Sequence, residues 1–432
     1  MTLRVLNYLE LESRLDRSGI GTAVDHQRAA LELTDTADVE VYTSPQQAFS
    51  PRKWVTNTLW SSTSDADLIP DLGTCNNPNE QSSDRNSRSD PDRSAQSHAD
   101  STQTPVSVSA ADTDTDTTID TSDSAVSSEQ AYDIIHCNLV GPGSVVVAQY
   151  ALRSKIPLIL HAHVTREDFA ESFRGSTTVA PVVERYLKWF YSHADLLLCP
   201  SAYTRRILQA YPVEAPIQAI TNGVDIESLS GFESYREHYR DRYDLSGTVV
   251  FGVGNVFERK GLTTFCQVAE QTSYDFAWFG PYDTGPQASR TVRRWTKNPP
   301  SNVTFTGWID DIRGAYAAGD IYFFPTKNEN QGIAVLEAMA CGKAVVLRDI
   351  PVFEEFYTHN EDCLKCETQQ EFRDAIHRLV NNPTLRSRLG ENAKATAQDH
   401  NLERVGDRLV ETYETVITAA EADREIPAAD IR

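Results

Sequence analysis

Two glutamates eight residues apart, Glu329 and Glu337, mark the part of the chain best suited to chemistry. The apolar run Ile321–Phe324 before them predicts a buried parallel strand, and the residues around Glu337 predict an apolar helix. A strand that leads through a short loop into a helix builds an anion site from unpaired backbone N–H groups and the helix dipole. At such a site Glu329 would accept sugar hydroxyls next to a phosphate, and Glu337 would reach a ribose. The pattern therefore predicts a sugar-nucleotide site, although an ordinary strand–turn–helix unit with two solvated glutamates remains the alternative.

A second motif, Gly252–Leu262, follows a predicted strand at 248–253 and leads into a helix. A group transfer that releases a nucleoside diphosphate must stabilise the charge that develops on the diphosphate, and fixed cations and backbone N–H groups do this. Arg259 offers a planar fork and Lys260 a point charge for that purpose. Gly254 and Asn255 belong to the same loop and are predicted to bind the donor. A solvated basic turn is the competing interpretation.

Two further segments in the first half of the chain are candidates. Ser18–Gly21 is read as a short glycine loop before a helix from about residue 22, in which Gly19 and Gly21 would let the backbone approach a diphosphate. His161 and His163 leave the carboxyl end of a predicted strand at 158–161. A metal site is the weaker interpretation of this pair because no cysteine or carboxylate lies nearby at ligand spacing. A structural, hydrogen-bonded histidine remains possible for either residue.

Taken together, these motifs resemble glycosyltransferase family 4, whose members are retaining enzymes with the GT-B fold. The resemblance rests on the spacing of Glu329 and Glu337, on the ending Glu337–Gly342, on Lys260-Gly261 and on Asn222–Asp225. The variant Glu-Asn-Gln-Gly at 329–332 is similar to a subgroup that contains diacylglycerol glucosyltransferases. The chain departs from the family where Asn255 replaces the usual arginine, so Arg259 is the substitute that we expect.

The resemblance assigns roles to the candidate residues. Glu337 is expected to hold the ribose, and Arg259 with Lys260 the diphosphate. Glu329 is expected to hold the sugar together with backbone N–H groups of residues from the following loop and helix, namely Asn330, Gln331, Gly332 and Ile333. By strand register His163 rather than His161 is expected to touch the sugar from the opposite domain. The resemblance further implies that the departing phosphate oxygen takes the acceptor proton and that neither a cofactor nor a metal is needed.

Alternating strand and helix patterns predict two parallel sheets, each covered by helices on both faces. Strands are expected near 3–8, 39–43, 134–136, 158–161 and 196–199, and in the second half near 248–253, 276–279, 303–305, 321–324 and 344–347. This α/β pattern fits GT-B, in which two doubly wound Rossmann-like domains face a central cleft. The predicted domains are residues 1–223 and 224–400. Residues 401–432, with a helix near 402–420, are expected from the resemblance to cross back onto the first domain.

The composition is strongly acidic, with a formal charge of −22 and only 9 lysines beside 31 arginines. Such a charge argues against nucleic-acid binding and favours a halophilic source as a hypothesis. Half of the charge lies in residues 61–130, which lack aromatic residues and are predicted to be a disordered insertion in the first domain. The triplet Asp114–Asp116 there imitates a metal motif by chance. Seven unpatterned cysteines suggest a reducing cytoplasm, and the lone pair Cys363 and Cys366 is too small a set for a structural zinc site.

Signals for the acceptor are weaker. No apolar run is long enough to span a membrane, and no cleavable leader is expected. A mixed basic and aromatic stretch lies near residues 50–60, and a second one near 184–191 places Arg185, Lys188 and Trp189 on one helical face. That face suits either a helix resting on an anionic membrane or a core helix with a solvated side.

The sequence thus predicts a retaining transferase that moves a hexose, glucose favoured, from a nucleoside-diphosphate sugar to a hydroxyl acceptor, a membrane lipid or a lipid-linked glycan. We expect it to act in the cytoplasm, in peripheral contact with the membrane. Two alternatives remain open at this point: a GT-B sugar-nucleotide epimerase and a non-catalytic sugar-nucleotide-binding protein.

Overall fold

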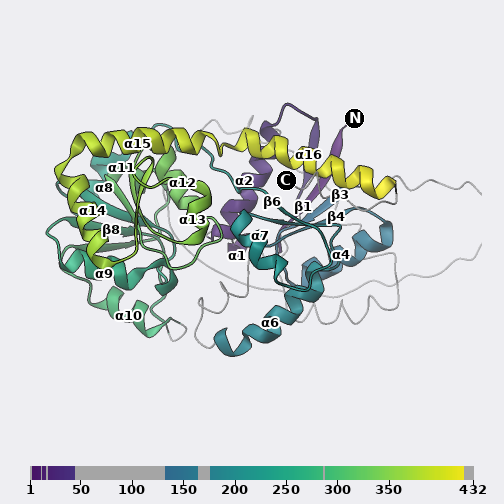
Figure 1. The fold of residues 1–432 in the computed structure, drawn as a ribbon, viewed down its shortest axis with the longest axis horizontal. Coiled ribbons are helices and arrows are strands. Elements are labelled where there is room, and N and C mark those ends of the chain that lie inside the picture. The colour runs from purple at the N-terminus through teal and green to yellow at the C-terminus, as the bar shows by residue number, and fades with distance from the viewer. Residues whose placement is uncertain are drawn as a thin grey trace, which may run out of the picture. The chain divides into compact units, whose positions relative to one another are not determined.

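The computed structural model describes residues 2–10, 12–15, 18–43, 132–163, 176–285 and 288–422. Within these ranges the chain forms two six-stranded parallel sheets, each with helices on both faces (Figure 1). The two doubly wound sheets predicted from the sequence are therefore confirmed. The predicted insertion at 61–130, its triplet Asp114–Asp116 and the basic and aromatic stretch at 50–60 lie outside the described residues.

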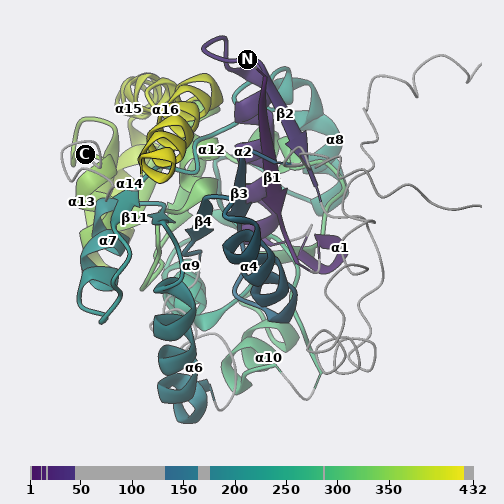
Figure 2. The ribbon, with the colours of Figure 1, turned by 90° about the vertical axis from the view of Figure 1, so that its right-hand side faces the viewer.

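The first sheet has the order β2-β1-β3-β4-β5-β6. Its strands are β1 (Leu3–Tyr8), β2 (Val39–Tyr42), β3 (Ile134–Cys137), β4 (Leu158–His161), β5 (Leu196–Cys199) and β6 (Ile217–Ala219). One face packs against α2 (Gly19–Leu33) and α16 (Leu402–Glu421), and the other against α4 (Pro142–Ser154), α6 (Ser176–Tyr191) and α7 (Ala202–Gln209). Helices α4 and α6 lie toward the viewer in Figure 2. The short helix α1 (Glu12–Leu15) follows β1. Because both faces are covered, the central strands β3, β4 and β5 are buried along their whole length.

The second sheet has the order β12-β11-β10-β7-β8-β9. Its strands are β7 (Val249–Val253), β8 (Asp275–Phe279), β9 (Val303–Gly307), β10 (Ile321–Phe324), β11 (Ala344–Arg348) and β12 (Cys363–Cys366). One face packs against α8 (Arg236–Tyr243), α11 (Arg313–Ala318), α12 (Ile333–Ala340) and α13 (Pro351–Phe356). The other packs against α9 (Leu262–Glu270), α10 (Arg290–Lys297) and α14 (Gln369–Asn381), while α15 (Pro383–Gln398) contributes to both cores. The 3-10 helices η2 (Phe232–Tyr235) and η3 (Glu258–Lys260) precede α8 and α9.

The C-terminal helix α16 is part of the first core although it follows the second sheet in sequence. Its apolar side chains, among them Val405, Leu409 and Tyr413, pack with α2 and with strands of the first sheet. The chain passes between the sheets twice, and the two passages lie side by side because Val224 forms a bridge with Asn401. Gly223 precedes this bridge with φ +68°, and a Cβ there would stand 2.8 Å from Val405. The domain boundaries given above stay a prediction.

Three sequence-based expectations need correction. Helix α2 begins at Gly19 rather than near residue 22, because the Ser18 hydroxyl accepts a hydrogen bond from Gly21 N–H and caps the first turn. The predicted glycine loop is therefore the start of a helix. The second sheet does not end at β11, because Cys363–Cys366 forms the edge strand β12 with both cysteines buried. The edge strand β6 of the first sheet was also missed.

Candidate functional site

Two loops meet at the carboxyl ends of β7 and β10, which are neighbours in the second sheet. The turn η3 ends at Gly261, whose φ of +83° is one that glycine adopts without strain. A Cβ at this position would stand 2.1 Å from the carbonyl oxygen of Pro325, so only glycine permits this close approach. The Lys327 N–H donates to the Arg259 carbonyl oxygen at 2.7 Å and ties the loops together. The predicted diphosphate cations are thereby placed beside the predicted sugar-binding loop.

Glu329 is the centre of this contact. Its side chain is only 8% exposed, and its Oε1 lies 2.5 Å from Lys260 Nζ and 3.5 Å from Arg259 Nη1. The Thr326 hydroxyl donates to the same oxygen at 3.0 Å. Burial alone would raise the pKa of this carboxyl, but the charges of Lys260 and Arg259 outweigh it and hold the pKa below its ordinary value. Among the described residues, every hydrogen bond and ion pair of this carboxylate reaches Oε1.

Glu337 lies in α12, eight residues after Glu329. The Tyr316 hydroxyl of α11 donates to its Oε2 at 2.5 Å. Burial raises the pKa of Glu337, and this hydrogen bond opposes the rise. Tyr316 therefore fixes one carboxylate oxygen, and the orientation of the other follows from it.

The amino end of α12 has the backbone geometry that the anion-site prediction requires. Gly332 begins the helix with φ +90°, and no side chain caps the end. The N–H of Ile333 belongs to the first turn, where backbone donors have no partner within the helix. This helix end therefore places unpaired backbone donors next to Glu329 in the chain.

The side chains of Asn330 and Gln331 contact residues of the first half of the chain. Gln331 Oε1 accepts the Asn222 N–H at 2.9 Å, and its amide group also donates to the Thr221 hydroxyl. Asn330 Nδ2 donates to the His163 carbonyl oxygen at 3.1 Å. The loop that carries Glu329 is thus hydrogen-bonded through Asn330 to the segment after β4 and through Gln331 to the segment after β6.

His163, at this edge, is held by an amide and a stacked ring. Its Nε2 lies 3.1 Å from Asn138 Oδ1, so Nε2 carries the proton. Asn138 Nδ2 in turn donates to Asn7 Oδ1 at 3.0 Å. The His161 ring stacks on His163 with centroids 4.0 Å apart and planes 2° from parallel. Burial lowers the pKa of His163 to about 3, so the ring is neutral and presents Nδ1 as an acceptor.

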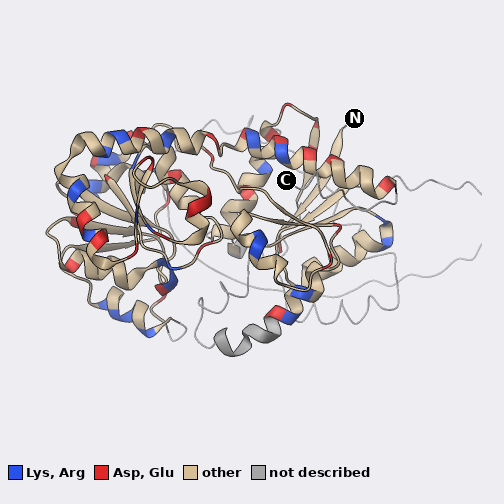
Figure 3. Cartoon of the chain, in the orientation of Figure 1, with Lys and Arg blue, Asp and Glu red and all other residues tan. Residues whose placement is uncertain are grey.

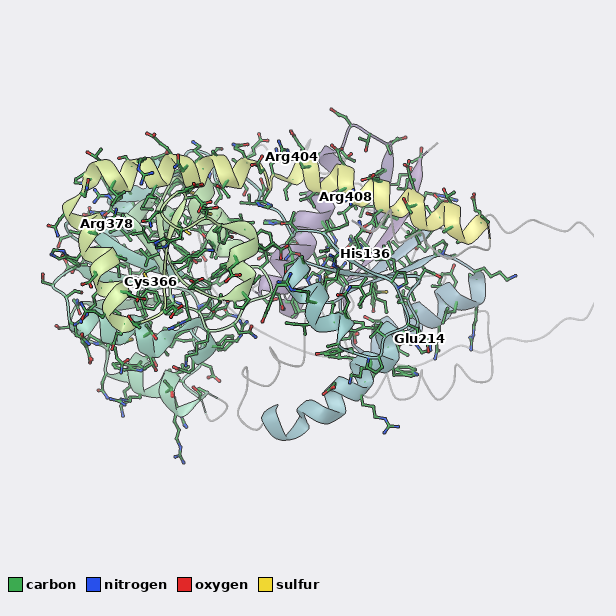
Figure 4. The ribbon with its side chains drawn as sticks, in the orientation of Figure 1. His136, Glu214, Cys366, Arg378, Arg404 and Arg408 are labelled. Carbon is green, nitrogen blue, oxygen red and sulfur yellow. The ribbon has the colours of Figure 1, made fainter. Side chains whose placement is uncertain are left out.

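The stacked histidines continue into a hydrogen-bonded chain that passes through His136, labelled in Figure 4, and ends on α16. Tyr413 OH lies 2.7 Å from His136 Nδ1, and His136 Nε2 lies 3.3 Å from His161 Nδ1. Gln27 Nε2 of α2 is 3.1 Å from the same His161 nitrogen. Because an amide N–H only donates, His161 Nδ1 accepts and the His161 proton sits on Nε2. Burial, and after it the charge of His163, lowers the pKa of His136 to about 3.

The remaining predicted residues lie at the same edges of the two sheets. Gly19 and Gly21 form the first turn of α2, and the N–H of Gly21 is occupied by the Ser18 hydroxyl. Gly254, with φ +126°, follows β7 and is fixed to β8, because its N–H donates to the Phe279 carbonyl oxygen at 2.9 Å. Asn255 follows it and is half-buried.

Three residues that hold the predicted groups were missed from the sequence. They are Thr326, which contacts Glu329, Tyr316, which contacts Glu337, and Asn138, which contacts His163. Thr326 follows a buried strand and was open to prediction by position. Nothing in the local sequence marks Tyr316 or Asn138, which approach their partners only through the fold. Across the described part of the chain, no group of three metal-ligating side chains is placed to hold a metal ion.

Two family models match the chain. "Glycosyl transferases group 1" matches residues 238–396, and "Glycosyltransferase Family 4" matches residues 123–228. A processive diacylglycerol alpha-glucosyltransferase of Acholeplasma laidlawii is 32% identical over 67% of this chain and 87% of that protein. An alpha-galactosylglucosyldiacylglycerol synthase of Streptococcus pneumoniae is 26% identical over 54% of this chain and 64% of its own length.

Solved structures agree on the fold. HepE of Anabaena, crystallised with UDP and glucose, matches 96% of this chain and 100% of its own, with a TM-score of 0.60 at 16% identity. Sucrose-phosphate synthase of Thermosynechococcus elongatus matches 67% of this chain and 74% of its own, with a TM-score of 0.57 at 22% identity. With both halves of the chain matched by family models and 87% of a curated relative covered, the protein belongs to glycosyltransferase family 4 and is a glycosyltransferase of the GT-B fold.

Proposed function

We propose that the protein transfers glucose from a nucleoside-diphosphate sugar to a hydroxyl group of diacylglycerol or of a glycosylated diacylglycerol, with retained anomeric configuration. The acceptor class is supported by the names of two relatives, a diacylglycerol alpha-glucosyltransferase and an alpha-galactosylglucosyldiacylglycerol synthase. The named relatives are transferases, so neither the epimerase nor the non-catalytic alternative is favoured.

The observation that carries the proposal is the contact of Lys260 and Arg259 with Glu329. Two cations face one carboxylate, which leaves net positive charge where a diphosphate would bind. In our proposal the diphosphate pairs with Lys260 and Arg259 as negative charge develops on the leaving group, and Glu329 Oε2 accepts hydrogen bonds from sugar hydroxyls. The low pKa of Glu329 supports this role because only the ionised form accepts from every hydroxyl.

The other predicted groups complete the donor site. Glu337, oriented by Tyr316, would accept the ribose hydroxyls, and the backbone of Gly332 and Ile333 would donate to the sugar or phosphate. Gly19 and Gly21 at the start of α2, and Gly254 with Asn255 after β7, would bring backbone to the diphosphate. His163 would contact the sugar as a neutral ring.

For the chemical step, we propose that the leaving phosphate oxygen takes the acceptor proton on the same face of the sugar. No protein nucleophile is required by this route, and the cations Arg259 and Lys260 serve the diphosphate without a metal. Product from an α-linked donor would then be an α-glucoside, which the anomeric proton coupling of the purified lipid identifies by NMR.

We further propose that α6 contacts the membrane surface, where a lipid acceptor would lie. None of the described helices is long and apolar enough to cross a bilayer. On α6, Trp189 is 50% exposed and Arg185 is exposed, whereas Lys188 pairs with Glu184 at 2.5 Å. An exposed indole beside a guanidinium suits a lipid–water interface.

The test is a transfer assay with labelled UDP-glucose, polar lipid and high potassium chloride, in which label is counted in organic and aqueous phases. Label in the organic phase is expected, and the Glu329→Gln variant should lose it while an exposed-carboxylate control, Glu354→Gln, should not. Labelled product in the aqueous phase alone would contradict a lipid acceptor.

A further inference from the structure

One corner of the first sheet carries polar groups that the donor site does not use. It consists of Tyr8 at the end of β1, Glu10 shortly after it, and Gly141–Ser144, which follow β3 and begin α4, and we call it the β1–β3 corner. Strands β1 and β3 pair in parallel with Tyr8 opposite Cys137, so both loops leave the sheet at its carboxyl edge. Asn138, which holds His163, lies in the same β3 loop. The corner is therefore next to the histidine proposed to touch the sugar.

Glu10 caps helix α4 from a distance. Its side chain is nearly inaccessible, with the residue 4% exposed, and Oε2 accepts the Ser144 N–H at 3.3 Å. The N-cap position itself is Gly141, which has no side chain to cap the helix. A Cβ at Gly141 would stand 2.1 Å from Glu10 Oε2, so the glycine makes room for the carboxylate. Among the described residues no lysine or arginine pairs with Glu10.

Two oxygen atoms in this corner are buried without any hydrogen-bond partner. They are Glu10 Oε1 and Ser144 Oγ, and Ser144 is completely buried. Buried polar atoms in folded proteins are almost always paired, because an unpaired group loses its bonds to water and gains nothing. One such atom at a helix end is unusual. Two of them on residues that are already hydrogen-bonded to each other indicate that a hydroxyl-bearing group completes the corner.

We propose that Glu10 Oε1 and Ser144 Oγ bind an uncharged hydroxyl group of the acceptor, and that Glu10 thereby sets the acceptor's charge class. This inference rests on the proposed function, since it concerns the acceptor of that transfer. The carboxylate accepts from the acceptor hydroxyl as the acceptor binds, and this hydrogen bond is given up when the same proton passes to the leaving phosphate oxygen in the transfer step. The serine hydroxyl pairs with the second oxygen of the same head group.

The negative charge of Glu10 would make the β1–β3 corner select an uncharged acceptor over one that carries a phosphate. A carboxylate with no lysine or arginine partner among the described residues repels a phosphate brought into the same low-dielectric space, whereas it attracts the O–H dipole of a glycerol or a sugar. Burial raises the pKa of Glu10, and the N–H groups of Gly143 and Ser144 oppose that rise and favour the ionised form. Glu10 also contributes, after burial, to raising the pKa of Tyr186 on α6.

The Glu10→Gln variant tests the inference without removing the cap. The amide oxygen still accepts from the Ser144 N–H, but an NH2 group replaces Oε1 and turns an acceptor into a donor. With 1,2-dioleoylglycerol in mixed micelles, we expect the acceptor KM to rise roughly tenfold or more, the range for losing a hydrogen bond to a charged group. The KM for UDP-glucose should stay within about twofold, and the preference for dioleoylglycerol over phosphatidylglycerol should fall about tenfold.

The Ser144→Ala variant distinguishes a binding role from a structural one. If Ser144 Oγ had no ligand, its removal would relieve an unpaired buried hydroxyl, and the protein would become no less stable with unchanged kinetics. We expect instead an increase of several-fold in the acceptor KM at an unchanged thermal midpoint. The matched control is Asp195→Asn, which alters a carboxylate of the same sheet that accepts the Leu158 N–H at 2.7 Å, at the opposite edge.

The outcomes separate the two proposals. Wild-type transfer to dioleoylglycerol with an unchanged acceptor KM in both folded variants overturns the role of Glu10 and Ser144 and leaves the proposed function standing. Wild-type transfer to phosphatidylglycerol but not to dioleoylglycerol overturns the uncharged-acceptor assignment. A wild-type enzyme that glucosylates neither of these lipids nor glucosyldiacylglycerol overturns the proposed function, and the inference falls with it.

Discussion

At the scale of single residues, Glu329 is ionised because of its neighbours and in spite of its burial. Lys260, Arg259 and Thr326 converge on one oxygen, and they keep a nearly inaccessible carboxylate charged. The same cations are thereby held in place before a donor arrives. The ion pair is thus formed without a ligand, and the buried charge of Glu329 is stable only while the cations are present.

Replacing Lys260 by methionine should destabilise the protein by roughly 3 kcal/mol at neutral pH, because Glu329 is left as a buried and poorly compensated charge. The native pKa of Glu329 lies below its ordinary value, so the pair stabilises the fold above that value and the stabilisation is lost as the pH falls through the native pKa. In Lys260→Met burial dominates and the pKa rises. The stability difference between the two proteins should therefore be largest at neutral pH and shrink in acid. Urea denaturation at two pH values measures it, and an equal loss at both would contradict this account.

Tyr316 provides a test of the ribose assignment with an internal control. Removing its hydroxyl in Tyr316→Phe frees Glu337 to rotate and should raise the KM for the donor about five- to tenfold, with a smaller change in kcat. The neighbouring Tyr322 is also fully buried, but among the described residues its hydroxyl makes no hydrogen bond to either glutamate. Steady-state kinetics of Tyr322→Phe should match the wild type. Equal effects of the two substitutions would assign Tyr316 to packing alone.

The residues proposed to carry out the chemistry could be named from the sequence, whereas the residues that orient them could not. Glu329, Glu337, Arg259 and Lys260 stand in local motifs at fixed spacing. By contrast, Asn138 meets Asn7 across 131 positions, and Ser144 meets Glu10 across 134. No local pattern records such a contact, because it arises only when parallel strands bring distant loops to one edge.

At the scale of elements, the approach of η3 to the loop after β10 depends on one glycine. Gly261→Ala would combine a left-handed backbone with a clash against the Pro325 carbonyl. We expect a loss of stability well above the approximately 1 kcal/mol that the left-handed backbone alone costs, together with a large loss of transfer activity. The control is Gly247→Ala, where φ is +58° but the space around a Cβ is open, and where only the backbone cost is expected. Similar unfolding midpoints for the two variants would contradict the close-approach argument.

The strands that the sequence analysis missed share a physical cause. Central strands are covered on both faces and flanked on both sides, so they read as continuous apolar runs such as Leu196–Cys199. The edge strand β6 consists of Ile-Gln-Ala, and β12 contains Lys365 between its cysteines. A short edge strand needs fewer apolar residues, so its residue pattern is not distinguished from that of a turn. The start of α2 was hidden for a different reason, since Gly19 and Gly21 suggest a loop unless the Ser18 cap is recognised.

At the scale of the whole molecule, acidic and basic side chains interleave along the described helices, as α15 and α16 show (Figure 3). Exposed pairs such as Arg404 with Asp399 contribute little individually, so they do not offset a net charge of −22. Long-range repulsion of this size is screened by salt. We expect the thermal midpoint to rise between about 0.1 M and about 2 M potassium chloride. A midpoint that falls over this range would contradict the proposed halophilic source.

The hydrogen bond between Tyr413 and His136 spans 277 positions and has a consequence for biosynthesis. The histidine stack lies at the carboxyl edge of a sheet whose strands are all complete by residue 219. Its last polar partner, and the helix that covers that face, leave the ribosome only after a further two hundred residues have been translated. Until then that face of the first sheet is covered by α2 without α16. A nascent chain that stops before α16 therefore lacks both the apolar side chains that complete this core and the hydroxyl that holds His136.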